Sequence, residues 1–287
     1  MCGRFAPSPT GRMHLGNAYS ALLSWLSARS QGGGWLLRIE DIDSQRSRTE
    51  YADQIKDDLR WLGLEWDGEC RQSDRSPLYE EALGHLTGLY HCRCTRADLL
   101  ATQAPHETDG RVVYAGTCRH KGYPDGALRI AVPRADILYT DLHYGPQRVN
   151  LTTHCGDFIL RRRDGAWAYQ LAVVVDDALT GVSEVVRGRD LLLSAAQQIF
   201  LHRALGYTPP QYGHLPLLIN AAGQRLSKRD RSLDLGALRQ RYTAPRLIGL
   251  ICHLAGLLPH PEALTAEEAI TLFDWKKLPA DDIVVAG

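Results

Sequence analysis

The chain of 287 residues lacks a long hydrophobic run and an N-terminal export signal. A membrane-spanning helix needs about 18 or more consecutive apolar residues, and no stretch approaches that length. No charged segment followed by an apolar one precedes the first predicted strand. These two absences predict a cytoplasmic protein that has no membrane partner.

The chain also lacks net charge and an even set of cysteines. Its 33 basic residues balance 33 acidic ones, so the total charge gives no general attraction to nucleic acid. Residues 221–248 are locally basic, although solvated helix faces often share that composition. The seven cysteines argue against a disulfide framework in a reducing compartment and favour a metal site for any cluster.

Two common phosphate-binding fingerprints, GxGxxG and GxxxxGK[ST], are missing as well. The N-terminus instead predicts a short strand at residues 4–6, a turn with two prolines, and a helix over residues 18–28. Such a turn binds an anion through free backbone N–H groups and the positive end of the helix dipole. Taken alone, it is equally compatible with an ordinary connection in which His14 is solvated.

Alternating strands and helices predict an α/β fold with a parallel sheet. The alternation includes a helix over residues 77–89, is lost in the following segment, and returns with a strand over residues 158–163. The last part is predicted to be helical and includes a helix over residues 261–273. The expected parts are the two halves of the catalytic fold, the insertion between them and a helical C-terminal domain: residues 1–89, 152–220, 90–151 and 221–287.

Several polar side chains are predicted to lie near the ends of strands, where ligands bind in open α/β sheets. Glu40 follows a buried strand, where it would either receive a ligand's ammonium group or face solvent. Asp190 is expected to cap a helix over residues 191–205. The other candidates are Arg4, Ser8, Tyr169 and Arg187.

Five sequence blocks resemble those of one enzyme family. FAPSPTGRMHLGN resembles the HIGH motif, and RLSKR resembles the KMSKS loop. LRIEDID, YQLAVVVDD and VVRGRDLL resemble further blocks, and all five follow the family's order between residues 4 and 230. On these motifs the chain resembles the catalytic half of a class I glutamyl-tRNA synthetase. The resemblance implies a Rossmann-like parallel sheet with a zinc-binding insertion and a small helical C-terminal domain.

The resemblance also implies a site that activates an amino acid with ATP. In this chemistry a carboxylate attacks the α-phosphate, and catalysis rests on positioning and on stabilising phosphoryl charge. By resemblance, His14 donates a hydrogen bond near the α-phosphate, and Lys228 closes over the departing phosphates. Arg225 and Arg229 depart from the generic loop, so Lys228 alone is expected to be catalytic there. The implied ATP site, with magnesium beside the nucleotide, comprises Thr10, His14, Gly16, Asn17 and Lys228.

A second implied site binds glutamate, whose ammonium and two carboxylates require both acidic and basic groups. Glu40 would take the ammonium, and Arg4 or Arg187 would hold the side-chain carboxylate bidentately. Glutamine would leave part of that fork unpaired, so the site would reject it. The glutamate residues implied by the resemblance are Arg4, Phe5, Ala6, Pro7, Ser8, Glu40, Tyr169 and Arg187.

Three cysteines in the predicted insertion, Cys92, Cys94 and Cys118, suggest a zinc site. The residues leave the fourth ligand open, because histidine is a common ligand and His91, His106 and His120 lie nearby. Cys-x-Cys followed by Tyr-x3-Cys resembles one branch of the family, which implies Tyr114 as the fourth ligand. One zinc ion would then be structural and would staple the small insertion.

After the RLSKR loop the chain departs from a full glutamyl-tRNA synthetase. The residues beyond Asp230 suit a few helices rather than a large anticodon-binding part. The pattern resembles a truncated branch of the family, which implies glutamate activation without tRNA and transfer to the queuosine base in the anticodon loop of tRNA(Asp). RNA loops offer splayed bases for such chemistry, and we expect a monomer. The alternatives are a truncated enzyme charging a tRNA 3′ end, an idle paralogue that binds tRNA or glutamate, and another HIGH-type nucleotidyltransferase.

Overall fold

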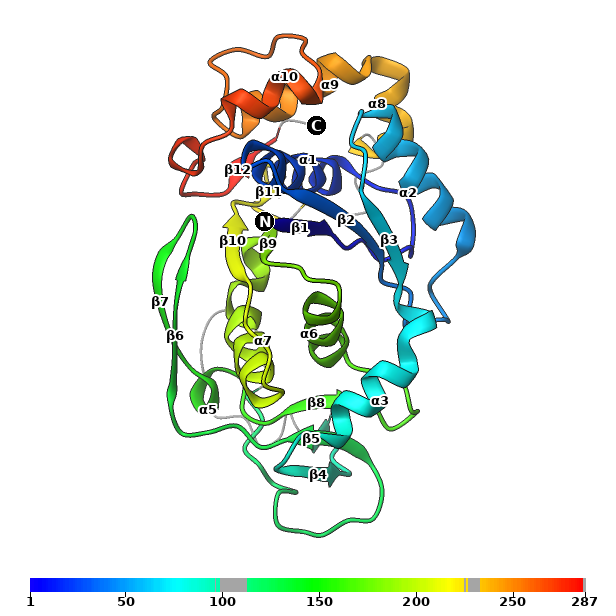
Figure 1. Cartoon of the computed structure of the whole chain (residues 1–287), viewed down its shortest axis with the longest axis vertical. Helices are drawn as coiled ribbons and strands as arrows, with labels where there is room; N and C mark the ends of the chain where they lie inside the picture. Colours follow the sequence, from blue (N-terminus) through cyan, green and yellow to red (C-terminus); the bar gives the residue numbers. More distant parts are fainter. Residues whose placement is uncertain (96, 99–112, 225, 227–232, 286–287) are drawn as a thin grey trace.

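The computed structural model describes residues 1–95, 97–98, 113–224, 226 and 233–285, and its centre is a parallel sheet (Figure 1). β1 (Cys2–Phe5), β2 (Gly34–Ile39) and β3 (Gly68–Arg71) pair in parallel in that order. Within these residues, no helix is long and apolar enough to cross a membrane.

A second pair of parallel strands continues the sheet. β9 (Glu184–Gly188) pairs with β10 (Gln211–Leu215). Just before β9, the backbone N–H of Ser183 donates to the carbonyl of Cys2 over 2.9 Å, so β9 lies beside β1. The resulting strand order is β3-β2-β1-β9-β10. The order in which the strands follow one another along the chain reverses between β1 and β9. Ligands of α/β proteins bind at the carboxyl ends of the strands beside such a change.

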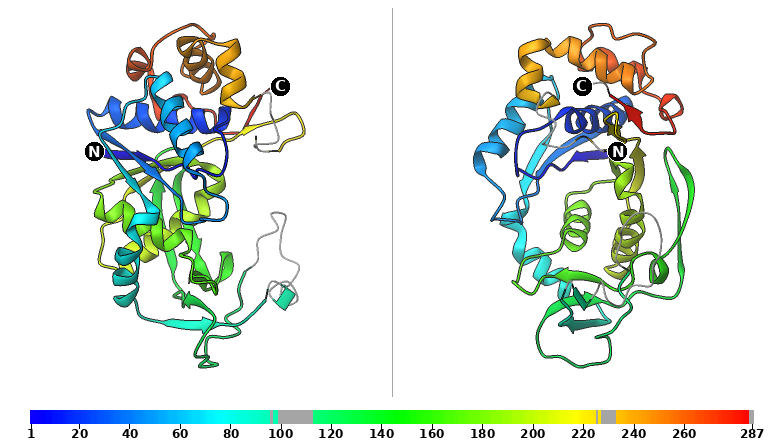
Figure 2. Two further views of the ribbon diagram at one scale, coloured as in Figure 1. Left: turned by 90° about the vertical axis from the view of Figure 1, so that its right-hand side faces the viewer. Right: turned by 180° about the vertical axis from the view of Figure 1, so that it is seen from behind.

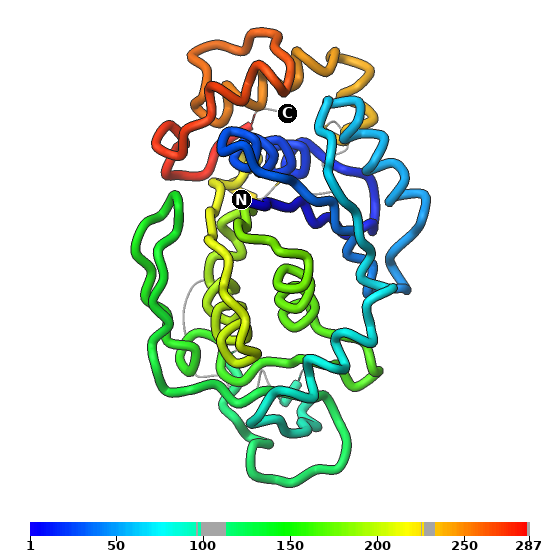
Figure 3. Tube along the Cα trace, in the orientation of Figure 1, coloured from blue at the N-terminus to red at the C-terminus, as the bar shows by residue number. Residues whose placement is uncertain are grey.

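Helices cover both faces of this sheet (Figure 3). α1 (Leu15–Ser30) packs on β1 and β9, and α10 (Ala266–Ala269) covers its outer side. On the other face α6 (Tyr169–Leu179) packs against α7 (Leu192–Ala204). Because α1 is enclosed from both sides, apolar residues occupy most of its circumference. α2 (Thr49–Trp61) connects β2 to β3, and after β3 a 3-10 turn (Gln72–Arg75) leads into α3 (Ser76–Gly84).

An antiparallel sheet lies at the end of the molecule away from the C-terminal helices (Figure 2). Its strands are β4 (Leu89–Cys92), β5 (Ala127–Ile130) and β8 (Phe158–Arg161), in that order. The assignment of the last strand to the second half of the catalytic sheet is therefore wrong. β8 pairs with β5, which lies about thirty residues earlier in the chain, and local sequence periodicity does not show which strands pair.

A hairpin links this region to the catalytic sheet. β6 (Asp136–Asp141) and β7 (Gly145–Asn150) pair in antiparallel fashion, and the end of β6 also pairs with β10. The short helix α5 (Leu151–His154) follows. The boundaries of the four expected parts remain a prediction, but β6 brings Asp141 from the expected insertion to the centre of the molecule.

Among the described residues, the C-terminal part contains three helices and one short strand. α8 (Leu235–Arg241) and α9 (Ala244–Leu254) precede α10, which continues into a 3-10 turn (Ile270–Leu272). A second 3-10 turn (Trp275–Lys277) leads towards β12 (Ile283–Val284), which pairs with β11 (Leu218–Ile219).

The structure corrects several predicted helix boundaries and one predicted cap. The helix expected over residues 18–28 runs from Leu15 to Ser30. The helix expected over residues 77–89 ends at Gly84, because Leu89 already pairs with β5. The helix expected over residues 261–273 begins only after Thr265, which forms a capping box with Glu268. Asp190 does not provide a side-chain cap for α7, because it lies in a 3-10 turn (Arg189–Leu191) and Leu191 is the cap residue.

Candidate active site and metal centre

The turn before α1 fixes the hydrogen-bonding state of His14. Its Nδ1 accepts the backbone N–H of Gly16 over 3.1 Å, and Asn17 Oδ1 accepts the backbone N–H of His14 over 3.1 Å. Because Nδ1 is an acceptor, a neutral His14 carries its proton on Nε2. The reciprocal cap therefore makes Nε2 a donor at the positive end of the α1 dipole.

A cavity of about 470 Å³ opens where β1, β2 and β9 end. It brings together all the predicted glutamate residues and most of the predicted ATP residues. These are Arg4, Phe5, Ala6, Pro7, Ser8, Glu40, Tyr169 and Arg187, with Thr10, His14 and Asn17. Gly16 lines a small adjoining cavity together with His14. Arg12, Ser20 and Asp190 also line the main cavity, and no motif in the sequence predicts a binding role for them.

Glu40 is held in a nearly buried position directly after β2. Its side chain is 10% exposed, and Oε1 accepts a hydrogen bond from Arg38 Nη2 over 3.2 Å. Burial raises the pKa of Glu40, although Arg38 and Arg4 act in the opposite direction. The sequence left open whether Glu40 binds an ammonium group or faces solvent, and the second expectation is wrong because the side chain is nearly buried.

A buried ion cluster lies behind the end of β2. Arg38 Nη1 donates to Asp177 Oδ1 over 2.5 Å, and Arg4 Nε lies 3.6 Å from the same oxygen. Asp176 accepts Arg75 Nε over 2.5 Å. Burial alone would raise the pKa of Asp177, but Arg38 and Arg4 lower it. Arg4 and Arg187 remain the two candidates for binding a carboxylate of the substrate.

Arg187 lies near the end of β9 with its guanidinium held from several sides. Nη1 donates to Gln198 Oε1 over 2.8 Å and lies 3.4 Å from the hydroxyl of Tyr169, the first residue of α6. Nη2 donates to the carbonyl of Leu191 over 3.2 Å. The guanidinium plane is therefore fixed before any ligand arrives.

One residue of the RLSKR loop, Leu226, and the segment after the loop lie near the turn before α1. The backbone N–H of Leu226 donates to the carbonyl of Leu218 over 3.1 Å, and that of Leu235 donates to the carbonyl of Met13 over 2.9 Å. Leu226 also lines the small cavity beside His14. Outside the described residues lie Lys228, Arg225, Arg229 and the possible zinc ligand His106.

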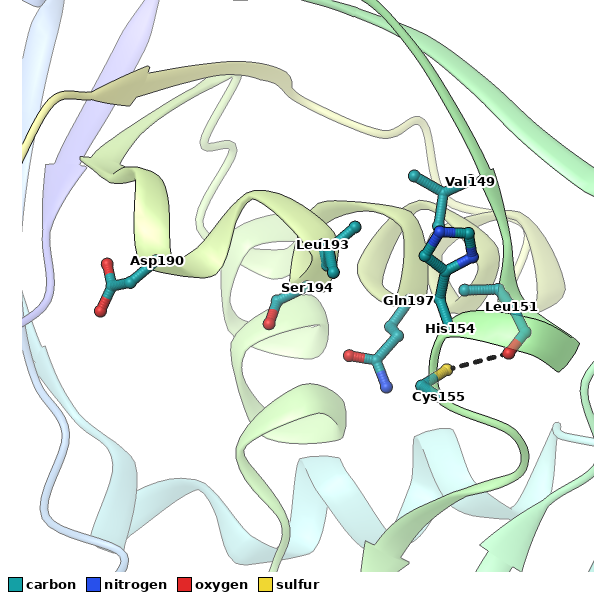
Figure 4. A pocket seen from close by; sticks show the side chains of 8 residues that line it. All are labelled: Val149, Leu151, His154, Cys155, Asp190, Leu193, Ser194 and Gln197. Carbon is teal, nitrogen blue, oxygen red and sulfur yellow. Dashed lines mark hydrogen bonds between the residues drawn. The ribbon is translucent and has the colours of Figure 1, made fainter. Parts of the chain in front are cut away.

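A further cavity of about 340 Å³ runs along α7 and is lined by none of the predicted site residues (Figure 4). Asp190 lies at one end and also lines the main cavity, so the two spaces adjoin. His154 and Cys155 lie at the other end, where the thiol donates to the carbonyl of Leu151 over 3.4 Å. Burial raises the pKa of Cys155 to about 12, which makes this thiol a poor nucleophile.

The three predicted cysteine ligands converge beside β4. Their Sγ atoms lie within 4.8 Å of one another, and the Sγ atoms of Cys94 and Cys118 are 3.4 Å apart. The hydroxyl of Tyr114 lies 3.4 Å from Cys92 Sγ and 4.0 Å from Cys94 Sγ. A tetrahedral zinc with Zn–S bonds of about 2.3 Å separates its sulfur ligands by about 3.8 Å, so these donors fit zinc. Within the described residues, no histidine nitrogen joins the cysteine group.

Hydrogen bonding gives the cluster unequal acidities. Burial would raise the pKa of Cys118, but hydrogen bonds, first from the Tyr114 hydroxyl, lower it to about 7. Burial and its hydrogen bonds to Cys92 and Cys118 raise the pKa of Tyr114. The phenol is therefore protonated without a metal, and a metal ion bound there would have to displace that proton.

Comparison with known proteins identifies the class of this fold. Residues 1–282 match the family of class I tRNA synthetases (E and Q), catalytic domain. A glutamate tRNA ligase from Elizabethkingia meningosepticum, solved in complex with its amino acid, superposes with a TM-score of 0.82 at 27% identity. The alignment covers 100% of this chain and 67% of that one. The glutamate-tRNA synthetase of Elizabethkingia anophelis gives a TM-score of 0.84 at 26% identity, covering 100% and 68% of the two chains.

Curated relatives narrow the assignment. The glutamyl-Q tRNA(Asp) synthetase of Symbiobacterium thermophilum is 47% identical over 99% of this chain and 95% of its own length. The protein of the same name from Deinococcus radiodurans is 47% identical over 94% of this chain and 95% of its own length. The chain therefore belongs, within the class I synthetases, to the family of the glutamyl-Q tRNA(Asp) synthetases.

Proposed function

We propose that this protein activates glutamate with ATP without tRNA and then transfers the glutamyl group to the queuosine base in the anticodon loop of tRNA(Asp). The single observation that carries the proposal is the main cavity. It joins an acidic and a basic anchor, Glu40 and Arg187, to the N-terminus of α1. The near-complete coverage of relatives with this name supports the choice of acceptor.

Glutamate binds, in this proposal, between the ends of β2 and β9. Glu40 takes the ammonium, and Arg187 with the Tyr169 hydroxyl takes the side-chain carboxylate. The α-carboxylate then points towards the N-terminus of α1, where it attacks the α-phosphate of ATP and pyrophosphate leaves. Because the two anchors are buried and prepositioned, little reorganisation is needed when the substrate arrives.

ATP lies, in this proposal, along the turn of residues 10–17. His14 Nε2 donates to an oxygen of the α-phosphate as negative charge grows there, and magnesium accompanies the nucleotide. Lys228 acts on the departing phosphates. The neighbouring described residues support this role, since the backbone N–H of Leu235 donates to the carbonyl of Met13 in the turn and Leu226 lines the small cavity beside His14. Removing a donor of this kind lowers the rate by about a hundredfold to a thousandfold.

Zinc is proposed as a structural ion held by Cys92, Cys94, Cys118 and Tyr114. The donor set is chemically suitable, because thiolates and an oxygen anion bind zinc in closed four-ligand sites. When bound, the ion would neutralise the charge that these ligands gain on losing their protons. The cluster lies beside the antiparallel sheet rather than in the main cavity, so no step of the reaction is assigned to it.

Two assays test the function. ATP–pyrophosphate exchange with glutamate should proceed without tRNA, whereas a requirement for tRNA would contradict the proposed activation step. Labelled glutamate should then transfer to tRNA(Asp) that contains queuosine and not to the same tRNA without it. Transfer that depends on an intact tRNA 3′ end and not on queuosine would instead establish a truncated enzyme that charges the tRNA terminus. A folded protein with neither activity would be an idle paralogue.

A further inference from the structure

We propose that Asp141 and His214 are positioning residues that fix the guanidinium of Arg187 for glutamate. The role rests on the proposed function, because it assumes that Arg187 binds the substrate. Asp141 ends β6, His214 lies in β10 and Arg187 lies in β9, so three strands supply one continuous chain of polar groups. His214 and Asp141 do not line the main cavity, and they act on the substrate only through Arg187.

Both links in the chain are short and buried. Arg187 Nε donates to His214 Nε2 over 3.1 Å, and His214 Nδ1 lies 2.6 Å from Asp141 Oδ2. The His214 side chain and the Asp141 side chain are both 0% exposed. A guanidinium has only donors, so His214 Nε2 must be the acceptor and the imidazole proton must lie on Nδ1, facing the carboxylate.

The other oxygen of Asp141 determines the orientation of the carboxylate. Oδ1 accepts the backbone N–H groups of His143 and Tyr144 over 3.0 and 2.9 Å, and that of His214 over 3.3 Å. Oδ2 alone faces the imidazole. The hairpin turn after β6 therefore sets the carboxylate, the carboxylate sets the histidine tautomer, and the tautomer sets the acceptor for Arg187.

This arrangement decides how Arg187 meets a carboxylate. Its five N–H groups include Nε, bonded to His214, and two on Nη1, directed to Gln198 and the Tyr169 hydroxyl. One N–H of Nη2 is bonded to Leu191, so among the described residues one N–H remains for a ligand. A symmetric fork is thus not available without rearrangement. The substrate carboxylate would meet one N–H and the neighbouring hydroxyl, and a small rotation of the guanidinium would misdirect that N–H.

Asp141→Asn is the decisive variant because it keeps the shape of the side chain. The three backbone N–H groups retain the amide oxygen, so the amide NH₂ faces His214 Nδ1 and donates to it. Nδ1 then becomes an acceptor, the ring proton moves to Nε2, and two donors face each other at Arg187. In exchange assays without tRNA, the KM for glutamate should rise about tenfold to a hundredfold, with the KM for ATP unchanged.

A second pair of variants keeps the test decisive if Asp141→Asn does not fold. His214→Gln offers an amide oxygen to Arg187 and an amide N–H to Asp141, so it should retain most of the glutamate affinity. His214→Leu offers neither and should lose it. His202→Phe is the matched control: this buried histidine of α7 has no hydrogen-bond partner among the described residues and lines neither cavity. It should leave the KM for glutamate unchanged.

Direct titration of glutamate into the protein separates failure of this inference from failure of the proposed function. Wild type that binds glutamate but does not exchange would refute the function, and the variants would still test the positioning role by affinity. Wild type that does not bind glutamate would overturn both. Folded Asp141→Asn with wild-type KM and affinity, or His214→Gln and His214→Leu with equal affinity, would overturn the positioning role alone. An equal rise in the KM for ATP and for glutamate would also overturn it, because it would indicate a general structural defect.

Discussion

Glu40 combines burial with an incompletely compensated charge. Its carboxylate is close to Arg38, but that arginine also serves Asp177 over the shorter distance of 2.5 Å. Burial raises the pKa of Glu40, so the ionised form needs another cation nearby. The ammonium of an amino acid bound in the main cavity would supply that cation. Substrate binding and ionisation of Glu40 are therefore expected to support each other.

Glu40→Gln should lower kcat/KM for glutamate in the exchange assay by about a hundredfold or more, because it removes one member of a buried charge pair. In wild type, kcat/KM should fall as the pH is lowered, since Glu40 must be ionised to bind an ammonium. The raised pKa places this loss above the ordinary value of 4.5. Glu80→Gln, which changes an exposed ion-pair residue, is the control and should have little effect. Normal activity in Glu40→Gln would show that Glu40 does not bind the ammonium of the substrate.

The sequence indicates candidate site residues most clearly where the interacting partners are close together in the chain. His14 and Asn17 share one turn, so their block carried its own signature. Asp177 and Arg38 are 139 residues apart, and Asp141 and His214 are 73 apart. Such partners act only through the fold. YQLAVVVDD was recognised as a block, but nothing in it indicated which arginine its aspartates would bind.

The residues around the cysteine cluster differ in the apolar core that they pack into. Cys92, Tyr114 and Cys118 form a small buried group separate from the two main apolar cores. The strands around it do join one of these cores, since Ile130 and Phe158 pack with residues of α6 and α7. The segment near the thiols therefore has only this small group to pack against, whereas the strands around it pack into a core shared with the catalytic part.

Purified protein should contain about one zinc per chain, and Cys118→Ser should release it or bind it much more weakly, because a closed site loses one of its four ligands. Metal analysis of the two proteins measures this directly. Cys252→Ser alters an equally buried thiol that lies in the other core, and it should keep its zinc. Zinc retained in full after replacement of Cys92, Cys94 and Cys118 together would show that the ion binds elsewhere.

At the level of elements, the sequence located strands and helices more reliably than it located their partners. β2 is predictable because it is a short apolar run between a glycine loop and a polar segment. β3 consists of Gly68, Glu69, Cys70 and Arg71, has no apolar run, and was not predicted. β8 has the same local pattern as β2 and yet pairs in another sheet. The late start of α10 was in principle readable, because Thr265 and Glu268 have capping-box spacing, but the broader helical pattern concealed it.

For the molecule as a whole, two buried histidines and three aspartates give stability the same dependence on pH. Burial lowers the pKa of His202 to about 4 and also lowers the pKa of His214. Both rings therefore take up protons more readily in the unfolded chain. Asp141, Asp157 and Asp177 have lowered pKa values, so they too bind more protons when unfolded. Stability should fall as the pH decreases, first through the histidine range and then through the aspartate range.

The histidine range can be tested with His202 alone. Its ring is 1% exposed, and Asp177 is the charged group that opposes the loss of its proton. Between the ordinary histidine pKa of about 6.5 and pH 5, this residue should cost the folded state about 2 kcal/mol. Urea unfolding at pH 7.5 and pH 5 measures the loss, and His202→Phe should reduce it by about that amount. Since the variant also removes a buried polar ring without a hydrogen-bond partner among the described residues, it should be no less stable than wild type at pH 7.5. An equal loss of stability in both proteins on acidification would show that His202 is not the group responsible.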